Sequence, residues 1–107
     1  MATAECESNN DRLWHMLKAL GHPVRLEIVR FVREHPHCIC NEILLQLPDD
    51  CTRAQSTLSQ HLKILREAGL VVADFDGSMT TYTIHHEHLG WLSEQITRLN
   101  NEASALA

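Results

Sequence analysis

Residues 55–72 read QSTLSQHLKILREAGLVV, and the rest of the fold can be worked out from this stretch. Leu58, Leu62 and Leu65 recur at spacings of four and three, which places them on one face of a helix. Gly69 is expected to end this helix, because glycine is favoured just beyond a helix C-terminus. The opposite face carries polar side chains, crowded toward the start of the helix, that suit base edges and phosphates.

Three further helices are predicted before this one. Residues 9–11, Asn-Asn-Asp, offer N-caps for the first, and Pro23 suits the first turn of the second. Pro36 stops the second helix, and residues 48–50, Pro-Asp-Asp, favour a turn after the third. The four helices are expected over residues 12–20, 23–34, 41–47 and 53–68.

The sequence after residue 69 predicts a hairpin and one more helix. LVVADFDGSMTTYTI (residues 70–84) alternates around Asp76-Gly77, a dipeptide that favours a type I′ hairpin turn. A last helix is expected over residues 86–102, with apolar residues spaced three, four and three, as in a helix that packs against another helix. The fold class is therefore mainly α with a small β-hairpin wing, a winged helix-turn-helix of five helices and one hairpin.

Length and composition limit the class of protein. A chain of 107 residues is long enough for one domain, which we expect over residues 11–103, between a flexible N-terminal segment (1–10) and a C-terminal tail (104–107). No apolar run approaches the length of a membrane span, and the N-terminus lacks the features of a secretory signal. We therefore predict a cytoplasmic protein with no membrane partner, in which the four cysteines are reduced.

The net charge of −5 argues against nucleic acid only superficially. Eight of the nine basic residues lie between Arg12 and Arg66 together with five acids, so eight minus five gives this span +3 and leaves −8 for the remainder. Because phosphate contacts depend on a local basic face, the acidic total does not exclude DNA.

Three segments, in this order and spacing, resemble the ArsR/SmtB family of small dimeric bacterial repressors. They are ALGHPVRLEIVRFV (19–32), CICNEILLQL (38–47) and AQSTLSQHLKILREAGLVV (54–72). The resemblance covers about Leu13 to Leu89 and implies a dimeric transcriptional repressor that binds double-stranded operator DNA. Helix-turn-helix proteins present the N-terminal residues of the recognition helix to the major groove. The residues expected to bind DNA are Gln55, Ser56, Thr57, Ser59, Gln60, His61 and Lys63.

The predicted wing departs from the family pattern. Wings of such proteins commonly carry Arg or Lys that contacts phosphate, whereas this hairpin has Asp74 and Asp76 and no basic residue. Either the wing stays off the DNA or it contacts DNA only through hydroxyl groups, and the salt dependence of binding is expected to be modest. The hydroxyl residues are Ser78, Thr80 and Thr81.

Both ends of the chain carry apolar stripes. They either bury against their own subunit or meet a partner, and a chain this short has difficulty covering two terminal apolar helices as well as a core. The resemblance implies a homodimer formed through these helices. The residues expected at its interface are Trp14, Leu17, Leu89, Leu92, Ile96 and Leu99.

The segment HPHCIC (residues 35–40) holds two cysteines two residues apart. Within a regular helix Cys38 and Cys40 would point about 200° apart and could not share an ion. If the third helix begins only after Ile39, Cys38 lies in an extended segment, and Cys40 lies at a helix N-terminus that favours its thiolate. Thiolates select soft metals and trivalent arsenic.

The resemblance extends to the inducer site, because metalloid and heavy-metal sensors of this family carry Cys-x-Cys at this position. Release of DNA on binding of As(III), Sb(III) or a soft ion such as Cd, Pb or Zn is therefore implied for Cys38 and Cys40. One type of arsenic sensor has a third cysteine where this chain has Ile43. The third ligand here is then Cys6, reaching over from the other subunit, or Cys51.

Other interpretations of the cysteines stay open. Cys38 or Cys40 could form a redox disulfide with Cys51 or Cys6 in response to peroxide or persulfide. Free cysteines are also often buried core residues. A thiol metal-buffering protein without a DNA role is a further alternative, although it leaves QSTLSQHLK unexplained.

The histidines and the remaining motifs add little chemistry. His35 and His37 could add nitrogen ligands that favour zinc, but histidines flanking a proline in a loop are more often solvated. Some zinc sensors of this family bind metal on the last helix, and the pattern around His85, His86 and His88 predicts that this second site is absent. We find no Gly-rich phosphate loop and no nucleophile with an evident base, so we predict no catalytic residues and no enzyme.

Overall fold

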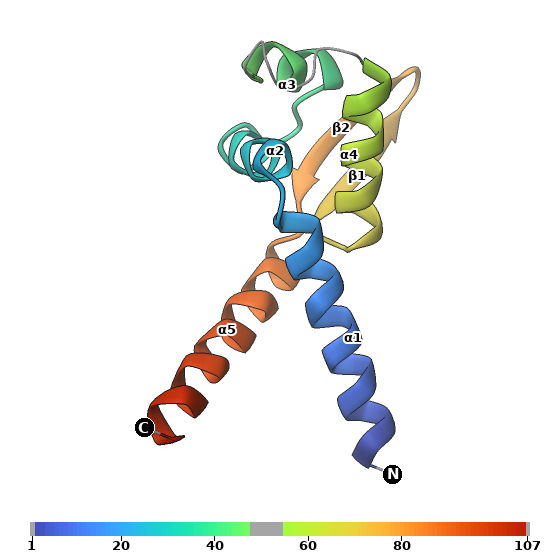
Figure 1. Ribbon diagram of the computed structural model, residues 1–107. Helices are drawn as coiled ribbons and strands as arrows, with labels where there is room; N and C mark the ends of the chain where they lie inside the picture. The colour runs from blue at the N-terminus through green and yellow to red at the C-terminus, as the bar shows by residue number, and fades with distance from the viewer. Residues whose placement is uncertain (1, 48–54, 107) are drawn as a thin grey trace.

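Five helices and a hairpin follow one another in the computed structural model, which describes residues 2–47 and 55–106, with side chains over 10–47 and 57–102. They are α1 (Ala2–Leu20), α2 (Pro23–Glu34), α3 (Cys40–Gln46), α4 (Gln55–Glu67), β1 (Val71–Asp76), β2 (Met79–Ile84) and α5 (His86–Leu106). Figure 1 shows α2, α3, α4 and the hairpin gathered at one end, while α1 and α5 project from the other. This order confirms the predicted winged helix-turn-helix class.

Local capping sets the start of α2 and α3. His22 is the N-cap of α2, where its Nδ1 accepts a hydrogen bond from the Val24 amide at 3.1 Å, and Pro23 occupies the first turn. The α3 helix begins at Cys40, one residue earlier than predicted, because the Ile39 amide donates to the Glu42 carboxylate at 2.9 Å. Both helices therefore lie close to where the sequence predicted them.

Two predicted boundaries differ. The α1 helix begins at Ala2, so the N-caps predicted at residues 9–11 are wrong, since those residues continue the helix. The predicted turn at residues 48–50 and the predicted start of the recognition helix at residue 53 lie outside the described residues. The remaining helices start or end within a few residues of the expected positions.

The hairpin forms as predicted, but its turn is of another type. Asp76 pairs with Met79, so the central turn residues are Gly77 and Ser78 rather than Asp76 and Gly77. Only Gly77 of this pair has a positive φ, 64°, which fits a type II′ turn with glycine in its first central position. The predicted type I′ turn is therefore wrong, since it would require positive φ at both positions.

The core lies where α1, α2, α3, α4 and the base of the hairpin meet. Leu58, Leu62 and Leu65 are buried, as the spacing in α4 predicted, and they share a cluster with Ile28 of α2 and Ile43 of α3. At the base of the hairpin, Val71 and Ile84 pair across the sheet and join the same cluster. No described helix is long and apolar enough to cross a membrane.

Gly69 ends α4 in a conformation that only glycine adopts without strain. Its φ is +83°, and a Cβ at this position would lie 2.8 Å from Nδ1 of His88 on α5. Gly69→Ala is therefore expected to destabilise the fold by more than about 1 kcal/mol. Gly90→Ala is the matched control because nothing lies within 4 Å of its Cβ position, and it should stabilise α5 by up to about 1 kcal/mol. Urea unfolding of both variants tests the pair, and equal effects would contradict the tight packing at Gly69.

Candidate functional site

The outward face of α4 presents the polar side chains that the sequence predicted to bind DNA. Ser59, Gln60 and Lys63 are exposed and Thr57 is half-buried, because the leucines of the same helix occupy its inward face. Gln55 and Ser56 belong to the first turn of α4, but their side chains lie outside the described residues. The described part of the set therefore forms one accessible surface of hydroxyl, amide and ammonium groups.

His61, the remaining member of the predicted set, contacts α2. Its Nδ1 lies 3.2 Å from Nη1 of Arg25, and its ring lies 4.8 Å from the ring of His22. Burial lowers the pKa of His61, and the neighbouring His22 and Arg25 lower it further. His61 is therefore neutral near pH 7 and brings no positive charge to the outward face.

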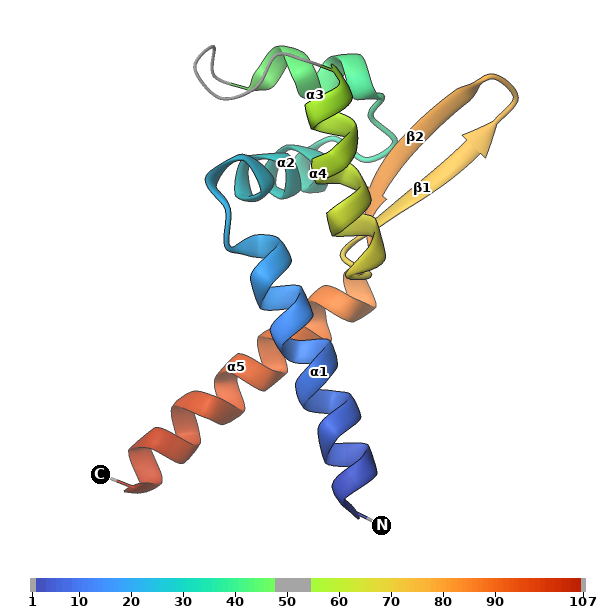
Figure 2. The same cartoon turned by 45° about the vertical axis from the view of Figure 1, so that its right-hand side comes forward.

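The wing carries acidic and apolar groups near its turn. Asp74, Asp76 and Phe75 are exposed on β1, and Met79 is exposed at the start of β2. Figure 2 shows the hairpin extending away from the helices, beside α4. Because this extension has no basic residue, any phosphate contact that it makes would come from hydroxyl or backbone N–H groups.

A hollow of about 340 Å³ lies where the wing, α3 and α4 come together. Ser59 of α4 faces it from one side, Ser78 and Thr80 from the wing, and Asn41 and Cys40 from the start of α3. The hollow is open and mostly polar. It brings one of the two cysteines of the Cys-x-Cys segment next to residues of the recognition helix and the wing.

Cys38 belongs to the edge of the sheet. Its carbonyl accepts a hydrogen bond from the Tyr82 amide at 2.9 Å, and the His37 amide donates to the Tyr82 carbonyl at 3.0 Å, so residue 38 pairs with β2 as an isolated bridge. The side chain is 3% exposed, and its Sγ lies 3.9 Å from the Tyr82 carbonyl oxygen. The extended conformation predicted for Cys38 is confirmed.

Burial raises the pKa of the Cys38 thiol, a hydrogen bond to the backbone opposes this, and the Glu42 carboxylate adds to the increase. Cys38 is thus a protonated thiol at neutral pH. Cys40 is half-buried at the first residue of α3, which confirms its predicted place at a helix N-terminus. Both thiols lie near Tyr82, whose pKa is raised by burial, then by Cys40 and, to a smaller extent, by Cys38.

A complete metal site is not assembled within the described residues. No three His, Cys, Asp or Glu side chains come together there in a way that could hold an ion. The described thiols of the predicted site are those of Cys38 and Cys40, and the side chains of Cys6 and Cys51 lie outside the described residues. Thiolates are the ligands that thiophilic metals and metalloids prefer, and a third sulfur would have to come from Cys6 or Cys51.

Three of the histidines weighed as ligands, His35, His85 and His88, have structural partners. His35 stacks on Phe31 with ring centroids 4.2 Å apart, and its Nδ1 contacts the Phe31 carbonyl at 3.1 Å. His85 and His88 stack on each other at 3.5 Å, and Nδ1 of His88 lies 2.6 Å from the Gly69 carbonyl. Packing and capping thus explain these three histidines without a metal ligand role.

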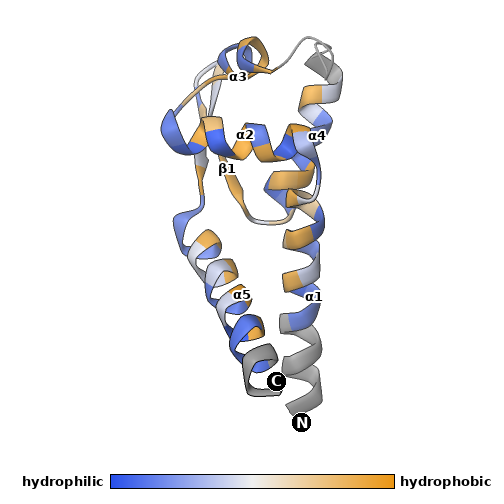
Figure 3. Ribbon diagram, turned by 60° about the vertical axis from the view of Figure 1, so that its left-hand side comes forward, coloured by the Kyte–Doolittle hydropathy of each residue, from blue (hydrophilic) through white to orange (hydrophobic). Residues whose placement is uncertain are grey.

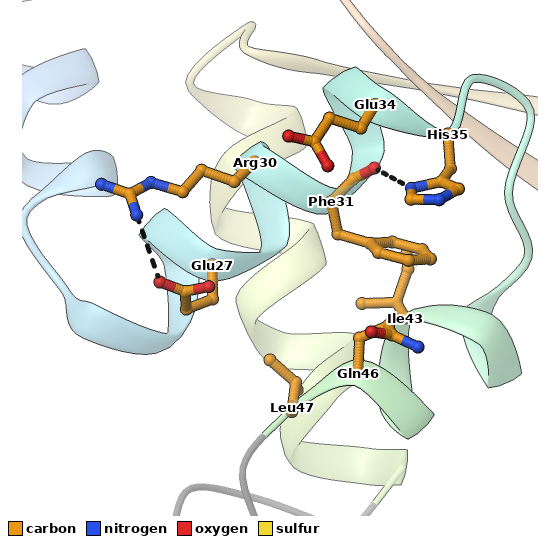
Figure 4. A pocket seen from close by; sticks show the side chains of 8 residues that line it. All are labelled: Glu27, Arg30, Phe31, Glu34, His35, Ile43, Gln46 and Leu47. Carbon is orange, nitrogen blue, oxygen red and sulfur yellow. Dashed lines mark hydrogen bonds and ion pairs between the residues drawn. The ribbon is translucent and has the colours of Figure 1, made fainter.

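A groove of about 240 Å³, which no sequence pattern predicted, lies between α2 and α3. Figure 4 shows its apolar floor, to which Phe31 and Ile43 contribute, and its charged rim, where Arg30 lies 3.7 Å from Glu27. No three His, Cys, Asp or Glu side chains among the described residues of this groove come together in a way that could hold a metal ion. We assign it no function.

The terminal helices expose much of the predicted interface. Trp14, Leu17, Ile96 and Leu99 are between 41% and 60% exposed, whereas Leu92 is buried in its own subunit and Leu89 is half-buried. Figure 3 shows apolar residues, in orange, along the described parts of both α1 and α5. A further hollow of about 300 Å³ between these helices is lined mainly by Leu20, Leu92 and Ile96.

Comparison with known families gives a consistent result. The sequence profile of the bacterial regulatory proteins of the arsR family matches residues 22–72. The HTH-type transcriptional repressor SmtB of Mycobacterium tuberculosis is 37% identical over 79 residues, which are 74% of this chain and 55% of that protein. The arsenical resistance operon repressor of Bacillus subtilis is 35% identical over 81 residues, 74% of this chain and 72% of that protein. The chain thus spans just over half the length of the mycobacterial relative.

Solved structures share the fold. An ArsR-like transcriptional regulator from Rhodococcus aligns with a TM-score of 0.77 at 19% identity, over 92% of this chain and 88% of that chain. Reduced HlyU from Vibrio cholerae aligns with a TM-score of 0.62 at 31% identity, over 89% of this chain and 95% of that one. The first likeness concerns the fold alone, whereas the second extends to the sequence.

The buried Cys38 thiol is expected to make the free energy of unfolding fall as the pH rises through the alkaline range. Its pKa is higher in the folded chain than in the unfolded chain, where it is about 8.5. The stability that the protonated Cys38 thiol contributes is therefore complete below that pH. It is lost as the pH rises toward the pKa of this thiol in the folded chain. Urea unfolding between about pH 8 and pH 10 should show falling stability, with a shallower fall in Cys38→Ala. Tyr82 acts in the same direction at higher pH and leaves a residual slope. Equal slopes in both proteins would contradict a buried, protonated thiol.

Proposed function

The chain belongs to the ArsR family of bacterial regulatory proteins, which are DNA-binding regulators rather than enzymes, and from this premise we propose a specific role for it. It is a transcriptional repressor that binds operator DNA as a homodimer. It releases that DNA when a thiol-directed inducer, As(III), Sb(III) or a soft metal ion such as Cd, Pb or Zn, binds Cys38 and Cys40.

The observation that carries this proposal is the backbone pairing of Cys38 with Tyr82. Through this pairing the Cys-x-Cys segment continues the sheet of the wing, and two residues later the chain enters α3 at Cys40. Because the Cys38 side chain is 3% exposed and its backbone pairs with β2, an inducer that binds this sulfur must move the segment that the bridge holds. That change would reach the wing through Tyr82 and the hollow beside Ser59 through Cys40.

The coupling takes the form of a population shift. The free protein holds Cys38 buried and extended against β2. A ligand that needs this sulfur exposed binds better to a conformation in which the bridge is altered, so it draws the population away from the arrangement of wing and α4 seen here. If that arrangement is the one that binds DNA, the inducer lowers operator affinity.

The chemistry of the two sulfurs favours soft ligands. Thiolates select soft metal ions and trivalent arsenic over hard cations, and a metal ion must displace the thiol protons that burial of Cys38 holds in place. Arsenite carries its own hydroxyl groups, which leave as water with the thiol protons, so its binding requires no net release of protons. The raised pKa of Cys38 therefore disfavours arsenite less than it disfavours a divalent metal ion.

The homodimer is supported by the shape of the subunit. The radius of gyration of the chain is 15.9 Å, whereas a compact domain of this length has a value of about 13 Å. The excess is consistent with the two terminal helices, which project from the remainder and expose large apolar side chains such as Trp14 and Leu99. A second subunit that covers these faces would remove them from water.

Operator release by an inducer tests the central claim. With the reduced protein and the DNA upstream of its gene, fluorescence anisotropy should show release on addition of arsenite or cadmium. Cys38→Ser and Cys40→Ser should each weaken this response at least tenfold while leaving DNA affinity nearly unchanged. Release by hydrogen peroxide alone, reversed by dithiothreitol, would replace the proposal with redox sensing. Indifference to all these agents would leave the cysteines as core residues.

Salt dependence tests the assignment of α4. Lys63→Ala should weaken operator binding and lower the slope of log K against log salt by about two, because each subunit of the dimer loses one phosphate contact. Gln60→Ala should cost about 1–3 kcal/mol on the operator and less on unrelated DNA. Arg98→Ala is the control, since it removes the same charge from exposed α5, away from the helix-turn-helix. Equal slopes for the Lys63 and Arg98 variants would contradict the assignment.

A further inference from the structure

A hollow of about 270 Å³ between α1 and α4 is separate from the thiol site and from the outward face of α4. Its floor is apolar, made by Ala19 of α1 together with Ile64 and Ala68 of α4. Lys18 and Arg25 stand at its rim. Its volume is slightly below the range of about 300–1,000 Å³ typical of drug-sized ligands, so the hollow is suited to a small molecule.

Arg25 brings a positive charge to this hollow, and none of the described carboxylates pairs with it. Its Nε donates to the Ala19 carbonyl at 2.6 Å, and its Nη2 donates to the Lys18 carbonyl at 3.4 Å, both in the last turn of α1. Its Nη1 contacts His61 at 3.2 Å. A guanidinium group has five N–H donors, so each terminal nitrogen keeps one further N–H after these contacts.

Lys18 adds a second positive charge at the rim. Its Nζ lies 5.6 Å from the Trp14 ring centroid, and neither Lys18 nor Arg25 takes part in an ion pair among the described side chains. His15, also at the rim, is engaged with Asp11. Glu67 is the one acid among the described residues that line the hollow, so the rim keeps a net positive charge beside an apolar floor.

We propose that this hollow binds a small organic anion, a monocarboxylate with an apolar body of roughly five to six carbons. The carboxylate meets Arg25, whose fork can hold both oxygens, together with the Lys18 ammonium. The apolar body covers Ile64 and Ala68, which removes part of an exposed isoleucine from water. An inorganic anion would leave this floor uncovered, and a neutral molecule would leave the two cations unpaired.

Such a ligand would join the terminal helix α1 to the proposed recognition helix α4. Because α1 is also a proposed dimer helix, the ligand would couple the subunit interface to the angle of α4. This regulatory consequence rests on the proposed function, whereas binding of the anion does not. The two claims are therefore tested by separate measurements.

Binding is measured on the full chain without DNA, by isothermal titration calorimetry and by the fluorescence of the tryptophans, one of which contacts Lys18. Hexanoate and benzoate are the probes, and hexan-1-ol, benzyl alcohol and inorganic phosphate are their matched controls. Ala68→Leu fills the hollow and keeps its charges, and Lys18→Met removes one charge. Arg30→Met removes a charge of the same sign from the exposed surface of α2 and serves as the control variant. Arg25 is left unchanged because it holds the end of α1.

The expected result is saturable binding of hexanoate or benzoate, weakened at least tenfold by Ala68→Leu and at least threefold by Lys18→Met, and unchanged by Arg30→Met. Equal binding of the alcohols, no saturation below about 10 mM, or indifference to Ala68→Leu would overturn the proposal. Affinity that falls as protein concentration rises would overturn it too, because a second copy of the chain would then cover the hollow. A protein that ignores arsenite but binds hexanoate would refute the proposed inducer and leave this inference intact.

Discussion

The pairing of residues 37 and 38 with Tyr82 is the constraint on which the functional end of the molecule depends. Two backbone hydrogen bonds hold this short segment against β2. They bury the Cys38 side chain in the core and stop α3 from extending toward α2, so that α3 begins at Cys40. The start of α3 in turn sets where it packs beneath α4, through Ile43. The wing, the two cysteines and the helix-turn-helix are thus parts of one hydrogen-bonded and packed unit.

The elements that the sequence predicted well are those in which a local pattern and the tertiary structure require the same residues. The leucine spacing of α4 predicts both a helix and its buried face, and Pro23 and Pro36 bracket α2 through their effect on the backbone alone. The extended conformation of Cys38 followed from the same reasoning, because Pro36 and the capping residue Glu42 leave only a short non-helical segment between them. Resemblance to a family added the expected function, the homodimer and the inducer site, whereas the order of the elements came from the residue patterns.

The features that could not be predicted depend on neighbours distant in sequence. His61 has the spacing of a partly outward residue, and only the approach of Arg25 and His22 turns its ring toward α2. The turn type of the wing depends on which residues pair, and a shift of one position moved the central pair to Gly77 and Ser78. The hollow between α1 and α4 has no sequence signature, since it exists only because small residues on two separate helices face each other.

The proposed thiol site and the proposed anion site lie on different sides of α4. The thiol site reaches α4 near its start, at Ser59, through α3 and the wing, whereas the hollow reaches it near its end, at Ile64 and Ala68, through α1. A rigid helix held at both ends can change its angle only if one set of contacts gives way. The buried contacts at Leu62 and Leu65 lie between the two sites and would act as the pivot. A ligand at either site would then change the orientation of α4. Each ligand would therefore alter the affinity of the protein for the other ligand.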